Sequence, residues 1–577
     1  MSLGFGSWII NLARPTVTRD VTRELLSDPF LQNPTASSIS VVWFTEFPGD
    51  RHWVDYGDGL SQQVEARTTQ LSRMQEDPPE DPNAQEGDAA PPGPPVPRPI
   101  WRHEATIFNL SPGSLPYRVV SATGNRQIES DTFQLAPQPS AGTPLKILLT
   151  SDHQQKPMTP ANLQKVVEAV GQVDAVFFAG DLVNVPDRAS EWFGPGGSFF
   201  RALQGRAAGE LTDSEGKTTY RGGAIIQSAP LFPAVGNHEV MGRVSEQPLN
   251  DQFNDPVPRA IAAQRYEAQA SVINPEADPA VRAAWLKENS FNIDTYQELF
   301  TLPDSAVDDK YYAVTFGDVR LVSLYITNIW RTPDLNPGAR GRYRERDADL
   351  MDPTQWGYGQ HIFEAIGPGS PQYAWLRQEV ESPEWQQARY RVVMFHHPPH
   401  SLGDNIVPAY SDPVQIIEAL PDGDLKSVRY EYPQDQDYLT QHVLPLIEAA
   451  GAQLVFYGHD HIWNRFTSPA GVHYLETSNV GNSYGAAWKT NRRQIPIGFQ
   501  ENYVPLGDPN GLEPVMPSIS PLRDDDGDLQ PFIASNEITV FSIFDTRSGT
   551  VSSYRFDTRQ PNSPVIKFDE FTLPPPG

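Results

Sequence analysis

Five short apolar runs along the chain each end in a cluster of polar residues. The runs cover residues 145–150, 174–179, 231–235, 390–395 and 452–457. Short, bounded apolar runs of this kind predict strands that are buried on both faces. Because α/β sheets place their functional groups at the ends of neighbouring strands, we expect the five polar clusters to lie close together.

The polar clusters contain the residue types of a metal site. They read Ser151-Asp152-His153-Gln154, Gly180-Asp181-Leu182-Val183-Asn184, Gly236-Asn237-His238-Glu239, His396-His397-Pro398-Pro399-His400 and Gly458-His459-Asp460-His461. Taken singly, the second and third are typical of turns, and the fourth is also compatible with a core histidine before a strand stop. The fifth is more specific, because consecutive polar residues at a buried strand end are costly without partners. Together, the five predict a metal centre.

Asp, Asn and His side chains suit borderline and hard divalent metals. Two such ions roughly 3.5–4 Å apart can clamp a phosphoryl group and generate hydroxide near neutral pH. One carboxylate must bridge them, and Asp181, which follows a glycine at a strand end, is well placed to do so. His459 and His461 point the same way along an extended chain, so each can serve one ion. His238 is then free to donate a proton to the leaving group.

The remaining pattern predicts two domains. Residues 1–20 form an N-terminal extension, and strand-like runs such as 38–44 and 116–120 predict an all-β sandwich over 21–142. The acidic, Pro-rich segment 75–99 inside it is expected to be a disordered insertion. Strand–helix alternation then predicts an α/β domain over 143–560, with a helix at 159–170 and a closing hairpin at 538–556. We expect insertions near 186–227 and 240–290, the second largely helical, and a C-terminal tail at 561–577.

The composition narrows the possible functions. The net charge of −28 argues against a nucleic-acid-binding surface and favours a small phosphate ester as substrate. The absence of cysteine excludes disulfides and thiolate metal sites. No run reaches the roughly twenty apolar residues that span a bilayer, and the N-terminal sequence lacks the basic region of a signal peptide. The aromatic residues of the insertion at 186–227 suit a substrate pocket and core packing equally.

In this order, the clusters resemble those of the calcineurin-like metallophosphoesterase superfamily. The sequences NPTASSISVVWFTEF, WVDYGD and LSPGSLPYRVV before them are similar to the fibronectin-like N-terminal module of purple acid phosphatases. The resemblance implies that the second domain is an αββα sandwich of two packed mixed β-sheets flanked by helices. Many members of the family are exported, which favours an extracytoplasmic location, whereas the residues themselves leave the compartment open.

The resemblance further assigns roles to individual residues. Asp152 and His461 would bind the first metal, Asp181 would bridge both ions, and the second metal would be held by Asn237, His396 and His459. His238 would be the proton donor or a phosphate ligand. His396 is chosen over His397 because the family ligand lies two residues before the proline. His397, His400 and Asp460 remain candidates for contact with the substrate or support of the ligands.

The first-metal ligands differ from both family patterns. The superfamily has Asp-x-His in the first cluster, whereas this chain has Asp152-His153-Gln154. Purple acid phosphatases instead use a tyrosine three residues after the bridging Asp, and Asn184 occupies that position. Gln154, Asn184 or His153 could replace the missing ligand. An oxygen-rich site without tyrosinate favours Mn²⁺ or Mg²⁺ over Fe³⁺, although Fe and Zn²⁺ also remain candidates.

These features predict a phosphatase that hydrolyses phosphate monoesters through attack of a metal-bound hydroxide at a binuclear centre. Monoesters are favoured because the N-terminal module resembles that of acid phosphatases. A phosphodiesterase of the same superfamily is the alternative within the enzyme class. A degenerate domain that binds a phosphate ligand or a protein partner without turnover is the alternative outside it.

Overall fold

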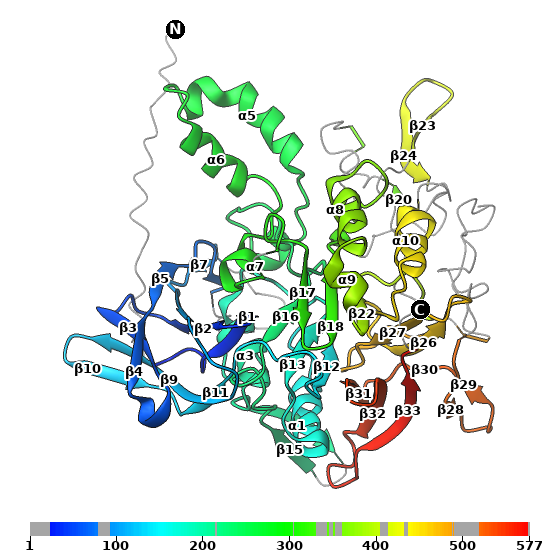
Figure 1. The fold of residues 1–577 in the computed structure, drawn as a ribbon. Helices are drawn as coiled ribbons and strands as arrows, with labels where there is room; N and C mark the ends of the chain where they lie inside the picture. The colour runs from blue at the N-terminus through cyan, green and yellow to red at the C-terminus, as the bar shows by residue number, and fades with distance from the viewer. Residues whose placement is uncertain are drawn as a thin grey trace.

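The computed structural model describes residues 24–78, 93–213, 216–303, 305–330, 343–344, 350–351, 361–403, 414–431, 437–486, 488–489 and 518–574. Figure 1 shows an N-terminal β domain, drawn in blue, that lies against a larger domain formed by the rest of the chain. No helix among the described residues is long and apolar enough to cross a membrane.

The N-terminal domain is a sandwich of two antiparallel sheets, as predicted. The strand orders are β1-β2-β8-β5 and β10-β9-β3-β4, and β11 pairs with β9. The strands are β1 (Phe30–Thr35), β2 (Ser38–Thr45), β3 (Arg51–Tyr56), β4 (Gln62–Glu65), β5 (Arg67–Gln70), β8 (Trp101–Ile107), β9 (Leu115–Thr123), β10 (Arg126–Glu129) and β11 (Phe133–Leu135), with a 3₁₀ turn at Asp58–Leu60.

Strand β2 joins the sandwich to the larger domain because its two faces enter different cores. Val41 and Trp43 pack inside the sandwich, whereas Val42 and Phe44 belong to the core of the larger domain. Successive side chains of a strand point to opposite faces, so a strand that is apolar at every position can be buried on both. The two domains therefore share packed surface.

The ends of the predicted disordered insertion 75–99 are ordered, while residues 79–92 lie outside the described part of the chain. β6 (Gln75–Glu76) pairs with β7 (Val96–Pro97). The carboxylate of Glu76 accepts hydrogen bonds from Ser190, and Asp77 forms an ion pair with Arg188 at 2.9 Å. These contacts fix the first end to the larger domain, and pairing of β7 with β6 fixes the second end.

The larger domain contains two mixed sheets. The six-stranded sheet has the order β16-β13-β12-β31-β32-β33, and the seven-stranded sheet has the order β17-β18-β22-β25-β27-β26-β30. The first comprises β12 (Lys146–Thr150), β13 (Ala175–Phe178), β16 (Leu231–Pro233), β31 (Ile538–Asp545), β32 (Thr550–Asp557) and β33 (Ile566–Thr572). The second comprises β17 (Tyr312–Phe316), β18 (Val319–Ser323), β22 (Tyr390–Met394), β25 (Leu454–Tyr457), β26 (Trp463–Thr467), β27 (His473–Thr477) and β30 (Phe532–Ile533).

One continuous core joins the two sheets, and helices cover the outer faces. Val392 and Met394 of β22 lie in the core that also contains β12 and β13, whereas Val393 faces the opposite side. There it meets α8 (Pro371–Val380), α9 (Pro383–Gln387) and α10 (Leu444–Ala449). On the six-stranded sheet, α1 (Thr159–Val170) packs against β31. The αββα sandwich is thereby confirmed.

Both predicted insertions have secondary structure of their own. The first holds α2 (Ala189–Phe193), α3 (Phe199–Leu203) and the hairpin of β14 (Gly209–Asp213) and β15 (Gly216–Tyr220). The second is largely helical, as predicted, with α4 (Leu249–Phe253), α5 (Arg259–Ile273) and α6 (Pro279–Glu288), followed by α7 (Asp294–Leu299). Figure 1 shows α5 and α6 projecting from the body as a helical hairpin.

Smaller elements surround the second sheet. They are the pair β19 (Thr327–Trp330) and β21 (His361–Phe363), the set β20 (Tyr343–Arg344), β24 (Leu425–Glu431) and β23 (Val414–Ala419), the pair β28 (Leu522–Arg523) and β29 (Leu529–Gln530), and a π-helical turn at Leu439–Val443.

The aromatic residues of the first insertion pack in the core at the domain junction. The Phe193 ring lies 5.0 Å from that of Phe44, and the Phe200 ring lies 5.0 Å from that of Phe30. A buried ion pair lies near this junction, with Arg73 Nε 2.9 Å from Asp187 Oδ2. These side chains hold the sandwich on the larger domain.

The structure corrects the predicted C-terminal tail at 561–577, because part of this segment belongs to the larger domain. Residues 566–572 form β33, which pairs with β32 and completes the six-stranded sheet. Phe571 and Leu573 are buried there, and the Asp569 carboxylate makes a two-pronged ion pair with Arg465 of β26, at 2.8 and 3.0 Å. The domain therefore extends beyond residue 560, because this strand contributes to both the sheet and the core.

Candidate metal centre

The polar clusters follow the carboxyl ends of strands that run in parallel within each sheet. β12, β13 and β16 are parallel to one another, and β22 is parallel to β25. The loops that follow these five strands bring together the candidate ligands, which are Asp152, Asp181, Asn237, His396, His459 and His461. All six are at most 2% exposed, so the predicted convergence of the clusters is found in the structure.

Four of these residues have a left-handed backbone conformation. The φ angles are 55° at Asp152, 58° at Asp181, 86° at His459 and 58° at His461. Such angles are uncommon in residues with a side chain and cost on the order of 1–3 kcal/mol each. Their concentration at these strand ends is typical of a functional site, where the surrounding structure imposes the geometry.

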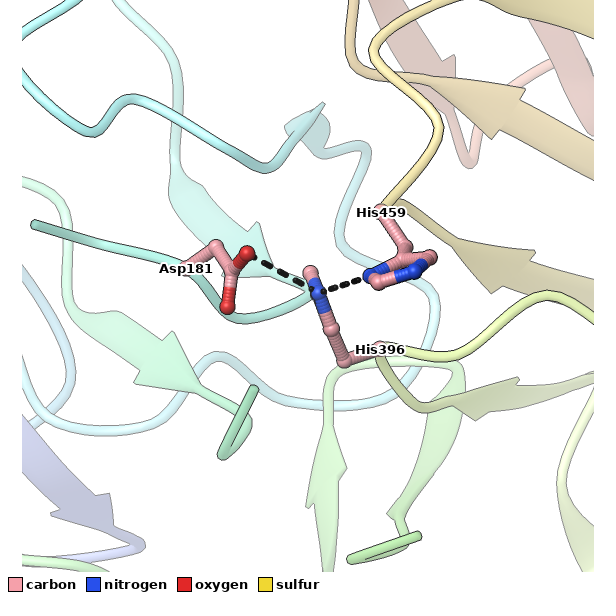
Figure 2. Close-up of side chains that lie close together, drawn as sticks. All are labelled: Asp181, His396 and His459. Atoms are coloured by element: carbon pink, nitrogen blue, oxygen red, sulfur yellow. Dashed lines mark hydrogen bonds and ion pairs between the residues drawn. The ribbon is translucent and has the colours of Figure 1, made fainter. Parts of the chain in front are cut away.

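The predicted second-metal ligands form one compact group, shown in part in Figure 2. His396 Nε2 lies 3.1 Å from Asp181 Oδ2 and 3.3 Å from His459 Nδ1. Asn237 Oδ1 lies 3.1 Å from the same His459 nitrogen. The ligand atoms of Asp181, His396 and His459 are all within 4.8 Å of one another. These nitrogen and oxygen donors match the preference of borderline divalent metals.

The predicted first-metal ligands form a second group that shares Asp181 with the first. Asp152, Asp181 and His461 also place their ligand atoms within 4.8 Å of one another. His461 Nε2 lies 3.4 Å from Asp152 Oδ1, and the backbone N–H of His459 donates to Asp152 Oδ2 at 3.0 Å. Asp181 is the member common to both groups, as expected of a bridging carboxylate.

Hydrogen bonds orient the ligand atoms. His396 Nδ1 donates to the carbonyl of Ala179 at 2.8 Å, and His461 Nδ1 donates to the carbonyl of Asn482 at 3.0 Å. Since a carbonyl oxygen is only an acceptor, these bonds fix the tautomers and leave each Nε2 free to bind a metal. Asp181 Oδ1 accepts from the backbone N–H of His238 at 2.9 Å, and Oδ2 faces His396.

The electrostatics of the cluster favour a bound cation. Burial is the largest single influence and would raise the pKa values of Asp152 and Asp181, but His396 and the other basic side chains nearby together outweigh it, so both carboxyl groups have lowered pKa values. Burial opposes the charge on His396 in turn, yet Asp181 and Asp152 raise its pKa to about 9. Two buried carboxylates that draw a proton onto a neighbouring histidine would also attract a metal ion.

The three candidates for the missing first-metal ligand have different surroundings. Gln154 Nε2 donates to Asp181 Oδ2 at 2.7 Å, so its amide reaches the cluster. Asn184 Nδ2 instead donates to the backbone carbonyl of Gln154 at 2.6 Å. His153 points away, with its ring 4.5 Å from that of Phe178 and Nε2 2.9 Å from Thr150 Oγ1. The structure does not bring His153 to the cluster, because its ring lies among apolar side chains. This corrects the prediction that His153 could be a supplementary ligand.

His238, the predicted proton donor, lies at the more accessible side of the cluster. Its side chain is 23% exposed, and Nε2 lies 3.9 Å from Asp181 Oδ2. Nδ1 donates to the carbonyl of Asn184 at 2.7 Å, and the ring packs 5.2 Å from that of Phe253. The Asn184 carbonyl and the Phe253 ring thus fix the orientation of the imidazole, with Nε2 directed toward Asp181.

The other predicted supporting residues differ in their relation to the cluster. The His397 ring lies 5.0 Å from that of His459 and 4.9 Å from that of Phe363, so it packs behind a ligand. The Asp460 backbone N–H donates to the buried carboxylate of Glu476 at 3.0 Å. His400 is not brought to the cluster: its ring packs 5.0 Å from that of Tyr474 in the helix-covered core, and burial lowers its pKa to about 4.

Two important residues were not assigned a role from the sequence. The Glu239 carboxylate accepts hydrogen bonds from the backbone N–H groups of Asp181, Leu182 and Gly236 at 2.9, 2.8 and 2.6 Å, and so ties two ligand loops together. Its position directly after Asn237-His238 was the only available signal. Lys156 is 3% exposed in the loop that follows Asp152. A lysine in a loop is normally solvated, so nothing in the sequence distinguished it.

Glycines let the ligand loops approach closely. A Cβ on Gly236 would lie 2.3 Å from Asp181 Oδ1, and one on Gly458 would lie 2.2 Å from Asp152 Oδ2. Real Cβ atoms do not come this close to an oxygen, so only glycine fits both positions without displacing a ligand.

Comparison with known proteins places this centre in a family. The chain matches the calcineurin-like phosphoesterase family over residues 145–463, more than half of its length. The purple acid phosphatase PPD1 from seeds of yellow lupin (Lupinus luteus) is similar in structure, with a TM-score of 0.50 and 12% sequence identity, over 94% of this chain and 73% of that one. GAP50, the anchor in the inner membrane complex of Plasmodium, gives a TM-score of 0.32 and 10% identity, over 75% and 90% of the two chains.

No significant match is found among curated protein sequences. At 12% identity, the likeness to PPD1 shows a shared fold. The family match covers the loops that carry Asp152, Asp181, Asn237, His396, His459 and His461. The chain belongs to the calcineurin-like phosphoesterases.

Proposed function

We propose that this protein is a metal-dependent phosphatase that hydrolyses small phosphate monoesters at a binuclear centre. The observation that carries the proposal is the presence of two ligand groups that share one carboxylate, Asp181. Asp152 and His461 would hold one ion, and Asn237, His396 and His459 the other, with Gln154 as the supplementary ligand of the first. When bound, the ions would neutralise phosphoryl charge and activate a water molecule.

The side chains around the ions would each have a definite task. The carbonyl groups of Ala179 and Asn482 keep His396 and His461 in the ligating tautomer. Glu239 holds the loops that carry Asp181 and Asn237. His238, directed by the carbonyl of Asn184, would donate a proton from Nε2 to the oxygen of the departing alcohol. A proton donor positioned in this way typically contributes about 10²–10⁴-fold to the rate.

The test is hydrolysis by protein that has been stripped with a chelator and reloaded with Mn²⁺, Fe or Zn²⁺. We expect metal-dependent turnover of nitrophenyl phosphate that exceeds turnover of the bis-ester. Preference for the bis-ester would favour the phosphodiesterase alternative. Metal binding without turnover of either ester would favour the non-catalytic alternative.

A matched pair of variants links the activity to the shared carboxylate. Asp181→Asn should lower turnover about a hundredfold or more, because Asp181 belongs to both ligand groups. Asp174→Asn is the control, since Asp174 lies just before the opposite end of the same strand, β13, and binds the backbone of Lys146. A fully active Asp181→Asn protein would exclude the proposed centre.

A further inference from the structure

Lys156 is a buried lysine next to the candidate metal centre. It lies in the loop between β12 and α1, which also carries Asp152. The residue is 3% exposed, and its Nζ has no hydrogen-bond partner among the described residues. A buried ammonium group without a hydrogen-bond partner is destabilising, so its presence at this position calls for an explanation.

The charges that act on Lys156 locate it on one side of the centre. Asp152 and Asp181 both act electrostatically on its ammonium group, and Lys156 acts in turn on His461. These three residues are the first-metal group. Lys156 is not among the main influences on His396 or His459 of the second-metal group. The three residues of the first-metal group are therefore close enough to Lys156 to interact with its charge.

Hydrogen-bonding chemistry indicates what the ammonium group would bind. Lysine offers three N–H donors and no acceptor. Asp152 and Asp181 would share their negative charge with the metal ions. The ammonium group of Lys156 would then lack a compensating negative charge. A phosphoryl oxygen held at the ions would supply one, through a charge-assisted hydrogen bond.

We propose that Lys156 binds a terminal oxygen of the substrate phosphoryl group on the first-metal side and thereby selects monoesters over diesters. This role rests on the proposed function and deepens it. A phosphate monoester dianion has three terminal oxygens and two negative charges, whereas a diester has two terminal oxygens and one negative charge. The Lys156 ammonium group, as a third cation beside the two ions, consequently stabilises a bound monoester more than a bound diester.

The test compares Lys156→Met with the parent protein, both loaded with Mn²⁺, by calorimetric titration with inorganic phosphate. Methionine keeps the length and apolar character of the side chain and removes the charge. We expect phosphate affinity to fall about tenfold or more. The ratio of monoester to diester turnover should fall as well.

Lys165→Met is the matched control. Lys165 lies in α1, forms an ion pair with Glu168 at 2.6 Å and packs over the Phe556 ring, so its loss should leave phosphate affinity unchanged. The metal-free Lys156→Met protein should have the same far-UV circular dichroism spectrum as the parent, because the substitution removes the charge and keeps the apolar stem of the side chain. This second reading separates loss of binding from loss of folding.

The outcomes separate this inference from the function on which it rests. Equal phosphate affinity in the parent and in Lys156→Met, or no binding by the parent, would overturn the role of Lys156. Phosphate binding that depends on Lys156, without turnover of either ester, would overturn the phosphatase and leave Lys156 as a phosphate-binding residue.

Discussion

The close approach of the ligand loops leaves no space for a side chain at Gly458. A Cβ on Gly458 would lie 2.2 Å from Asp152 Oδ2 and 2.4 Å from Ser151 Oγ. The substitution Gly458→Ala should push Asp152 away from the first-metal group and weaken metal binding by about 10- to 100-fold. Titration of chelator-stripped protein with Mn²⁺ measures the change.

Gly196→Ala is the control for this substitution, because a Cβ there would meet no described atom within 4 Å. The prediction fails if Gly458→Ala binds Mn²⁺ as tightly as the control does.

The sequence predicted that the candidate ligands converge, because their residue types and strand-end positions are visible in it. It did not predict which way the side chains near these ligands point. Left-handed angles at Asp152 and Gln154, with φ of 55° and 37°, turn the chain so that Gln154 faces Asp181 while His153 faces Phe178. Such turns follow from tertiary contacts, for which a single sequence has no signal. The burial of Lys156 was hidden for the same reason.

At the scale of elements, β33 joins the two sheets through one ion pair. Asp569 of β33 binds Arg465 of β26 with two hydrogen bonds, and the two side chains are 6% and 7% exposed. Asp569→Ala would leave Arg465 buried without its carboxylate, which should lower the free energy of unfolding by about 3–5 kcal/mol. Urea denaturation measures the loss.

The surface pair of Arg282 and Glu267, 44% and 62% exposed, provides the comparison. Glu267→Ala should change the free energy of unfolding by no more than about 1 kcal/mol. Losses of equal size in the two variants would contradict the structural role of β33.

Prediction of the elements succeeded where the apolar pattern was strong, as in α1 and in the hairpin of β31 and β32. It failed at β33, where IKFDEFT alternates between exposed and inward positions but contains three charged residues and is flanked by prolines. The two inward residues, Asp569 and Phe571, are buried by partners that are distant in sequence. Pairing with β32 and Arg465 therefore determines the strand more than its own composition does.

At the scale of the whole molecule, acid should destabilise both domains together. The neutral ring of His103 in β8 is stacked on that of His52, with a centroid distance of 3.6 Å, and contacts Thr45 Oγ1 at 2.8 Å. Burial lowers its pKa from 6.5 to about 2. Between these values the unfolded state binds a proton that the folded state does not, so His103 makes the folded state less stable as pH falls below about 6.5.

His103→Gln removes this dependence. The stability advantage of the parent over the variant should shrink by about 1.4 kcal/mol for each pH unit below 6.5, as measured by urea denaturation at pH 8, 6 and 5. Because Val42 and Phe44 of the sandwich belong to the core of the larger domain, fluorescence and phosphate binding should report the same loss. A difference that does not vary with pH would contradict the prediction.

The contact between Asn184 and Gln154 limits how this protein can exchange ligand sets during evolution. Asn184 holds the backbone carbonyl of Gln154 at 2.6 Å, and the Gln154 amide reaches Asp181 at 2.7 Å. A single mutation to tyrosine at position 184, the residue that purple acid phosphatases carry there, would remove the side-chain bond to the Gln154 carbonyl before a tyrosinate ligand was established. The intermediate would have neither arrangement, so the two positions should change together along a lineage and be inherited as a pair.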